Sequence, residues 1–220
     1  MEAAKEDLAS LLVWSNGVGH LPLENGDYAS YVDFLKGREK EKDAVYRGMV
    51  RERIKMIRRT VFSNEHVLKC LDVYIGGGLF IREMNSKTDI ETSGLDVSVY
   101  ALRWLKSNEY ESVGDVYDIL TFWDAFDQIP GPHLYIKDYK PRYVAVSVPI
   151  YHSKEQIVSS PYFNTSKRFW FFTKLGLIKW MGDLDFSLVT CDNQEDIRFG
   201  MDRYQTFIFA ANTKHKAIYG

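Results

Sequence analysis

One hydrophobic segment that runs into three glycines, Leu71–Phe80 (LDVYIGGGLF), limits the folds open to this chain more than any other feature. A strand that ends in glycines and then opens a helix is typical of the first strand-to-helix turn of an open α/β sheet. Ligands bind at the carboxyl ends of such strands, because glycine lets the backbone approach closely and the helix N-terminus offers free N–H donors. The segment therefore predicts a fold class and the place of a binding site.

The rest of the chain supports an α/β fold. From Val67 onward, short strand-like and helix-like segments alternate, which predicts a mainly parallel sheet with helices on both faces. The expected strands are 67–74, 93–97, 116–122 and 143–148, with a terminal, antiparallel pair at 185–190 and 206–210. The expected helices are 79–84, 98–106, where Ser98 is the predicted cap, and 173–181.

The first 45 residues differ from the rest of the chain. Five Gly and Pro residues interrupt them and the charge run 37–43 ends them, so we interpret residues 1–45 as a solvated leader or lid and residues 46–220 as the Rossmann-like domain. At the boundary, 44–61 has apolar residues at helical spacing among Arg and Lys. This pattern predicts an amphipathic helix that packs on the domain and keeps a strongly basic face in water.

Composition excludes several classes of protein. The 28 Lys and Arg nearly balance the 30 Asp and Glu, which argues against a basic nucleic-acid clamp and against strong binding to a nucleic-acid backbone. We find no export signal or membrane-spanning segment. Two distant cysteines favour a reducing, cytoplasmic setting, and five scattered histidines lack the ligand spacing of a zinc site, so no metal is expected.

A second acidic segment strengthens the binding-site prediction. Gly94–Ser98 (GLDVS) places Asp96 at the end of the next strand, 18 residues after Gly78, where a carboxylate can accept both hydroxyls of a ribose. The glycines are not a dinucleotide fingerprint, because Ile81 stands where the third glycine belongs, and no P-loop sequence is present. The two segments together predict a nucleoside site.

The order of these signals resembles class I S-adenosylmethionine-dependent methyltransferases. Besides LDVYIGGGLF and GLDVS, three later segments are similar to that family: YDILTFWDAFDQIPGP (117–132), YVAVSVPI (143–150) and FFTKLGLIKWMGDLDFSLV (171–189). The resemblance covers residues 67–210 and is greatest to bacterial and phage members of the group that contains ubiquinone-biosynthesis O-methyltransferases. It implies a Rossmann-like class I methyltransferase fold and S-adenosylmethionine as the cofactor.

Residue roles follow from this resemblance position by position. The residues that match cofactor-binding positions are Asp72, Gly76, Gly77, Gly78, Asp96, Val97, Phe122 and Trp123. The first four would hold the methionine end, Asp96 the ribose and Val97 the adenine. Phe122 and Trp123, followed by Asp124, match the segment that forms the floor of the methyl-transfer site.

The chain also departs from the family pattern. Tyr74 stands where the first motif has its first glycine, so this motif is degenerate and the tyrosine ring occupies space that a ligand would need. Asp127-Gln128 stands where relatives have Glu-His after the family's fourth strand, which the expected strand 116–122 resembles. The stretch 160–168 has no histidine, where similar sequences are rich in it.

These departures leave three hypotheses open. Methyl transfer from a sulfonium is an in-line displacement that the cofactor drives, so the protein mainly orients the reactants and a fixed base is dispensable for good nucleophiles. If a base exists, Asp124, Asp127 and His152 are the candidates, although a histidine placed like His152 is more often a solvated loop-tip residue and an aspartate placed like Asp124 is more often a helix cap. The first hypothesis is a methyltransferase acting on a small, flat or nucleotide substrate. The second is an inactive, methyltransferase-like protein with a binding or structural role and a protein partner; another nucleotide-binding α/β domain is the third.

The aromatic residues carry the same alternative. They make up 15% of the chain. They cluster in two segments, Phe122–Phe126 at the end of the expected strand 116–122 and Phe169–Phe172 just before the late helix. There they would either cage a sulfonium or a flat substrate, or form core between sheet and helices.

Overall fold

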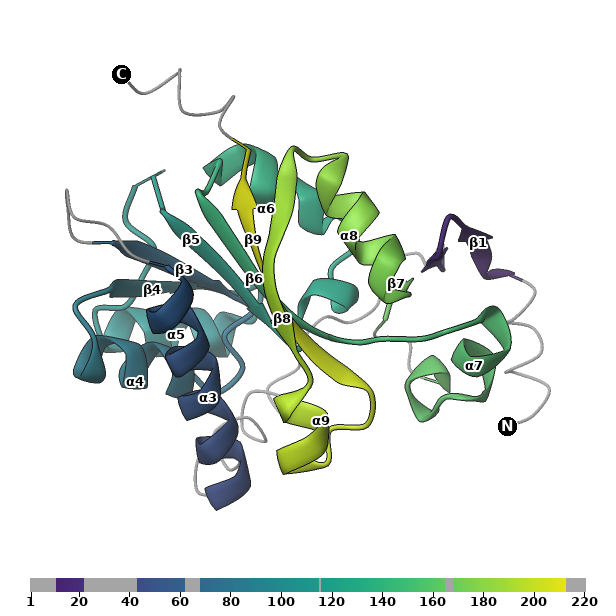
Figure 1. Ribbon diagram of the computed structural model, residues 1–220. Helices are drawn as coiled ribbons and strands as arrows, with labels where there is room; N and C mark the ends of the chain where they lie inside the picture. The colour runs from purple at the N-terminus through teal and green to yellow at the C-terminus, as the bar shows by residue number, and fades with distance from the viewer. Residues whose placement is uncertain (1–10, 22–42, 62–67, 115, 165–167, 213–220) are drawn as a thin grey trace.

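A six-stranded sheet forms the centre of the computed structural model, which describes residues 11–21, 43–61, 68–114, 116–164 and 168–212 (Figure 1). Its strands, in spatial order, are β4 (Glu91–Leu95), β3 (Lys69–Val73), β5 (Ile119–Trp123), β6 (Tyr143–Pro149), β9 (Tyr204–Ala211) and β8 (Phe186–Asp192). The first four are parallel, and β9 is antiparallel to both of its neighbours. This arrangement confirms the predicted α/β class with a mainly parallel sheet and an antiparallel terminal strand.

Helices cover both faces of this sheet (Figure 1). They are α3 (Ala44–Thr60), α4 (Leu79–Lys87), α5 (Val99–Ser107), α6 (Pro132–Tyr139), α7 (Lys154–Ser159), α8 (Lys174–Gly182) and α9 (Gln194–Phe199), with short 3₁₀ turns η1 (Phe126–Gln128) and η2 (Pro161–Asn164). The predicted helices 44–61, 79–84, 98–106 and 173–181 correspond to α3, α4, α5 and α8. Asp43 caps the N-terminus of α3, because its carboxylate accepts a hydrogen bond of 2.7 Å from the Val45 N–H.

The alternation of side chains along β5 shows how the two layers are filled. Ile119 and Trp123 point into the layer under α3 and α4, whereas Leu120 and Phe122 point into the layer under α6 and α8. All five residues of β5 are buried, as expected for a central parallel strand with both faces covered. The central strands therefore hold their carboxyl ends rigidly at one edge of the sheet.

A smaller sheet pairs the start of the chain with its later part. Strands β1 (Val13–Ser15) and β2 (Val18–His20) form a hairpin, and β2 pairs antiparallel with β7 (Trp170–Phe172). Leu12 and Leu21 are buried with Tyr151 and Phe171, so the expectation of a purely solvated leader is wrong for residues 11–21. Gly17, whose backbone is left-handed, serves the tight turn of the β1–β2 hairpin instead of a linker. The other leader residues, 1–10 and 22–42, lie outside the described part, and the domain division stays a prediction.

Among the described residues, no helix combines the length and the hydrophobicity that crossing a bilayer requires.

Candidate functional site

The loops that follow β3, β4 and β5 meet at the carboxyl edge of the sheet. They comprise residues 74–78, 96–98 and 124–125, and they open α4, α5 and η1. Since the three strands are parallel and adjacent, their carboxyl ends share one edge, which is where α/β sheets bind ligands. We take this edge as the candidate site.

The glycine-rich loop between β3 and α4 has an unusual backbone. Tyr74 (φ +63°), Gly76 (φ +57°) and Gly78 (φ +82°) all lie in the left-handed region. Gly76 is exposed, and a Cβ there would meet no heavy atom within 4 Å, so a ligand can approach its backbone. A Cβ at the buried Gly78 would collide with the Trp104 ring, so this glycine allows the helices to pack. Gly77 is buried as well.

Tyr74 keeps the backbone conformation of the glycine that the family resemblance places there. Left-handed geometry costs a residue with a Cβ about 1 kcal/mol, so surrounding contacts must hold it. Its N–H donates to the Leu95 carbonyl at 2.7 Å, and its hydroxyl is hydrogen-bonded to Tyr135 of α6. Burial raises the pKa of the Tyr135 phenol, and the nearby charge of Asp96 raises it further. The two phenols thus form a pair that lies within the electrostatic influence of Asp96.

Asp96 lies directly after β4, as predicted, but its carboxylate serves the local backbone. Its Oδ1 accepts a hydrogen bond of 2.8 Å from the Ser98 N–H, and the N–H groups of Ile75 and Val97 also bond to it. Burial raises the pKa of Asp96 to about 6, against these donors. The structure places Ser98 at the predicted cap position of α5, where its side chain makes no cap hydrogen bond. Val97 is 45% exposed beside it.

Asp72 lies inside β3 and not at its end. It faces the layer under α3 and α4, is buried, and accepts a hydrogen bond of 2.7 Å from the Thr121 hydroxyl on β5. Burial raises the pKa of Asp72 to about 7, while the Thr121 hydroxyl and the charge of Arg53 oppose the rise. The structure thus places this carboxylate beneath the glycine loop.

The two aromatic residues predicted to form the floor of the site point to opposite faces. Phe122 is fully buried against Phe126 and Tyr135 in the layer under α6 and α8. Trp123 lies on the other face, with its ring against Phe80 and the Arg53 guanidinium 4.8 Å from the ring centroid. The two rings therefore do not lie side by side, and each takes part in core packing.

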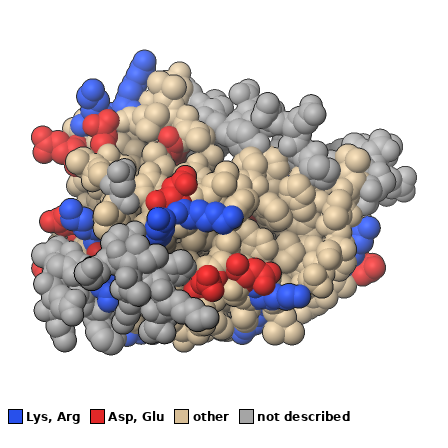
Figure 2. Space-filling model, turned by 90° about the horizontal axis from the view of Figure 1, so that it is seen from above, with Lys and Arg blue, Asp and Glu red and all other residues tan. Residues whose placement is uncertain are grey.

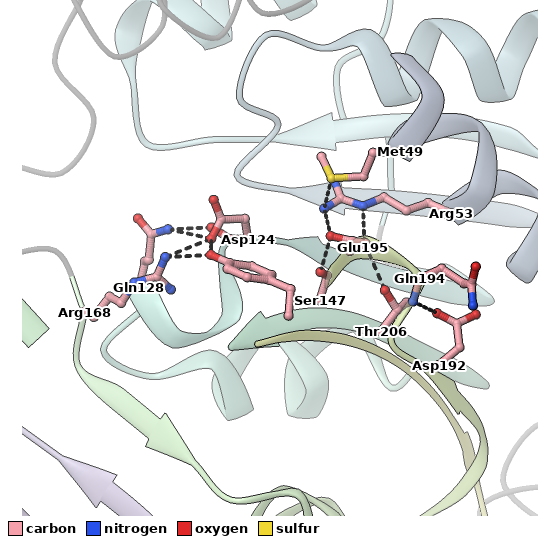
Figure 3. Close-up of polar contacts among 11 residues, drawn as sticks. Met49, Arg53, Asp124, Gln128, Ser147, Arg168, Asp192, Gln194, Glu195 and Thr206 are labelled. Atoms are coloured by element: carbon pink, nitrogen blue, oxygen red, sulfur yellow. Dashed lines mark hydrogen bonds and ion pairs between the residues drawn. The ribbon is translucent and has the colours of Figure 1, made fainter. Parts of the chain in front are cut away.

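Asp124 belongs to a cluster of charged side chains on the next part of the edge (Figure 3). It has a left-handed backbone (φ +55°), and its Oδ1 accepts hydrogen bonds from Arg168 Nη2, at 3.0 Å, and from the Tyr204 hydroxyl. Arg168 also forms an ion pair with the buried Asp127. Burial raises the pKa of Asp127 to about 6, and Arg168 opposes the rise. Two carboxylates thus share one guanidinium.

His152 is separate from this cluster. It follows β6 in the loop before α7. Its side chain is exposed, and its backbone N–H donates to Gln156 Oε1 at 2.6 Å. Among the described residues, no hydrogen bond or ion pair joins its imidazole to Asp124 or to the glycine loop.

A second charged group, formed by Arg53 and Glu195, lies beside β6 and β9 (Figure 3). Arg53 Nε and Nη2 donate to the two Glu195 oxygens at 2.7 Å each, and both residues are buried. Glu195 also accepts hydrogen bonds from Ser147 at 2.8 Å and from Thr206 at 2.9 Å. This bidentate pair joins α3 to α9 across the strand ends, so the charged segment between β8 and β9 is anchored to the domain.

The fold has many counterparts among solved structures. A methyltransferase from Clostridium acetobutylicum, described as S-adenosylmethionine-dependent, matches with a TM-score of 0.57 and 11% identity over 83% of this chain and 99% of its own. The Burkholderia thailandensis 1,6-didemethyltoxoflavin-N1-methyltransferase, solved with S-adenosylhomocysteine, matches with a TM-score of 0.56 and 12% identity over 91% and 99%. The chain has the class I methyltransferase fold.

This likeness is limited to the fold. The cyclase SpnF matches as well, with a TM-score of 0.55 and 12% identity over 87% of this chain and 86% of its own, so the fold is not tied to one reaction. No protein-family model and no curated protein matches the sequence.

Two places where the chain departs from the methyltransferase pattern lie in contact. Asp127, which precedes Gln128, is ion-paired with Arg168, the last residue of the stretch that lacks histidine. Gln128 in turn donates to the Asp124 carbonyl. Where the resemblance leads one to expect imidazoles, this fold therefore holds an internal ion-pair network.

Sequence reasoning missed Arg53, Arg168, Glu195 and Tyr204. One signal for Arg53 was present, because it occupies the apolar stripe of α3 between the buried Val50 and Ile57. A charged residue on such a stripe needs a buried partner. The partner, Glu195, is 142 residues away, and no pattern in the sequence connects the two.

Proposed function

We propose that this chain binds S-adenosylmethionine at the carboxyl ends of β3 and β4 and transfers its methyl group to a small or flat nucleophile. The observation that carries the proposal is the exposed, left-handed Gly76 beside Asp96. The Ile75 N–H bonds to Asp96, so the glycine loop and the acidic residue are held together. This is the pair of features that a nucleoside site in an α/β sheet requires.

The residues at this edge fit an adenosine in chemical character. Gly76 leaves its backbone accessible, Asp96 offers a carboxylate with acceptor capacity beyond the backbone N–H bonds it already accepts, and Val97 presents an exposed apolar surface. The cofactor would supply an activated methyl group on a sulfonium. The roles proposed for Asp72, Gly77 and Gly78 are indirect, because these buried residues support the loop from below.

The chain would contribute orientation and exclusion of water. The Asp124 Oδ1 already accepts hydrogen bonds from Arg168 and Tyr204, so only its Oδ2 would be left to accept a proton from the substrate. His152 is exposed and would need to be brought to the site by the acceptor or by a loop movement. We therefore propose an acceptor whose nucleophile is reactive without a strong base.

Calorimetric titration with S-adenosylmethionine and S-adenosylhomocysteine tests the proposal, with Asp96→Asn as the decisive variant. Asparagine keeps an oxygen for the Ser98 N–H but loses the charge and one acceptor, so we expect about 10- to 100-fold weaker binding with a similar melting temperature. The matched control is Asp118→Asn, at a carboxylate near the opposite ends of the strands, which should leave affinity unchanged. Absence of wild-type binding at millimolar ligand would overturn the proposal.

A second candidate function rests on Tyr74. Its hydroxyl is bonded to Tyr135, close to Asp96, and its backbone is where the resemblance places a glycine. In this alternative, the tyrosine pair takes the place of the nucleoside and the chain is a binding protein without methyl transfer. Failure of wild-type binding combined with tight binding by Tyr74→Gly would favour it.

A further inference from the structure

Charge is distributed very unevenly between helix α3 and the rest of the molecule. The 17 residues of α3 include six Arg or Lys and one Glu, a net charge of +5, whereas the whole chain carries −2, so all other residues together carry −7. Figure 2 shows a face of the molecule where Lys and Arg are interspersed with Asp and Glu among large uncharged areas. The near-neutral total therefore conceals one strongly basic element.

The cations of α3 form a continuous stripe on its exposed side. Only Arg53 points inward; the exposed residues are Arg47, Arg51, Lys55, Arg58 and Arg59. They recur at intervals of three or four residues, so they lie on one side of the helix over about 18 Å, at 1.5 Å of rise per residue. We refer to these five residues as the α3 stripe.

Neighbouring acidic groups neutralise only part of this stripe. Lys55 pairs with Glu52 at 2.9 Å, and Arg59 pairs with Asp192 at 3.2 Å. Both pairs are largely exposed, and such pairs contribute little and exchange readily with other anions. Within the described residues, Arg51 and Arg58 have no ion pair at all, so they offer unpaired guanidinium groups.

We propose that the α3 stripe is a docking surface for the phosphate backbone of a nucleic acid. Four of its five cations are arginines, whose planar guanidinium groups bind phosphate oxygens in bidentate fashion. A regular row of cations about 18 Å long fits a regular row of phosphates better than it fits a single small anion.

A membrane surface fits this helix less well. Amphipathic helices bind bilayers through a free apolar face, but the apolar face of α3, including Val50, Ile54 and Ile57, is buried against the domain. The inner side of α3 also carries Arg53, which lies over the Trp123 ring at the end of β5. A nucleic acid on the outer side would therefore lie along the helix that borders the candidate site.

Fluorescence anisotropy with labelled single-stranded RNA and DNA, measured over a range of salt concentrations, tests this proposal. Four phosphate contacts predict a slope of about −3 in a plot of log K against log salt concentration, with dissociation constants near the micromolar range at low salt. Arg51→Ala/Arg58→Ala should weaken binding at least tenfold at low salt and reduce the slope by about 1.4. Since neither arginine forms an ion pair within the described residues, the melting temperature of the double variant should match that of the wild type.

The matched control is Arg103→Ala/Lys106→Ala, which removes two exposed cations from α5 and should leave affinity and slope unchanged. Failure of the wild type to bind either oligonucleotide at low salt would overturn the proposal, as would equal losses in the α3 and α5 variants. Polyglutamate serves as an acidic-protein probe. If it displaces the RNA as effectively as unlabelled RNA does, the stripe recognises acidic proteins instead.

Discussion

Two regions at the carboxyl edge of the sheet satisfy their polar groups in different ways. In the glycine-loop region (residues 74–78 and 96–98), the Asp96 carboxylate accepts hydrogen bonds from backbone N–H groups close to it in the fold, and Gly76 is open to solvent. In the ion-pair region (Arg53, Asp124, Asp127, Arg168 and Glu195), charged side chains bond to one another, and four of the five are buried. The first region leaves one backbone position open to solvent, and the second is filled by its own side chains.

The two regions differ in how easily their carboxylates can exchange hydrogen-bond partners. A carboxylate held by backbone donors keeps spare acceptor capacity and can exchange partners with a ligand at small cost. A buried bidentate pair cannot, because removing either partner leaves an uncompensated charge in a medium of low dielectric. We therefore expect variants in the ion-pair region to affect folding and variants in the glycine-loop region to affect binding.

The largest expected effect comes from breaking the ion-pair region at Glu195. Glu195→Ala leaves the Arg53 guanidinium buried without its partner and also removes the acceptor of Ser147 and Thr206. We expect the free energy of unfolding, measured by urea denaturation, to fall by about 3–5 kcal/mol. The double variant Arg53→Met/Glu195→Leu, which removes both charges, should lose less than half as much. A loss below about 1 kcal/mol for Glu195→Ala would contradict the view that the ion-pair region stabilises the fold more than the glycine-loop region does.

The fold was largely predictable because its signals are local. The hydrophobic runs at 67–74 and 143–148, the glycines after the first of them and the apolar spacing of 173–181 each lie within one element. The small sheet was not predicted, since β1, β2 and β7 have three residues each and β2 pairs with β7 across about 150 positions of the sequence. Short strands of this kind carry too few residues to show a period of two.

The candidate site was also predictable only in part. Asp96 and the glycines could be found because their spacing is fixed by one strand–turn–helix unit. The Arg168 pairs could not, because they span 41 and 44 residues and join segments that separately appear as a loop and a polar stretch. The placement of Asp72 inside β3 shows a further limit: a carboxylate one residue before the end of a strand can turn into a layer and leave the edge.

Asp72 lies between the two regions and gives the second prediction, on pH dependence. Its pKa is about 7 in the folded chain, raised by burial from 3.8, so between about pH 4 and pH 7 the folded chain binds a proton that the unfolded chain has lost. The free energy of unfolding should therefore fall as the pH rises through this window. Asp96 and Asp127, with pKa values of about 6, act in the same direction at slightly lower pH.

Asp72→Asn removes one of these contributions while keeping an acceptor for the Thr121 hydroxyl. We expect the fall between about pH 4 and pH 7 to be smaller by about 2–4 kcal/mol in urea denaturation series. The variant should be closest to, or more stable than, the wild type at about pH 7. An unchanged pH profile would mean that Asp72 is ionised throughout, held so by the Arg53 charge, and would make it part of the ion-pair region.

The smallest expected effect decides whether the glycine-loop region is open or filled. Tyr74→Gly removes a Cβ and a ring from a left-handed position, so relief of about 1 kcal/mol of backbone strain offsets the lost contact with Tyr135 and stability changes little. If the ring stands in the way of the cofactor, S-adenosylmethionine should bind about tenfold more tightly than to the wild type, a gain of about 1.4 kcal/mol measured by calorimetry.

Tyr74→Phe is the control for this change, because it keeps the ring and removes only the hydroxyl that bonds to Tyr135. It should bind like the wild type if the ring is the obstacle, and like Tyr74→Gly if the bonded phenol pair is. Weaker binding by Tyr74→Gly would reverse the argument: the tyrosine would then contact the cofactor. The glycine-loop region would in that case be a working site whose first glycine has been replaced by a residue that binds.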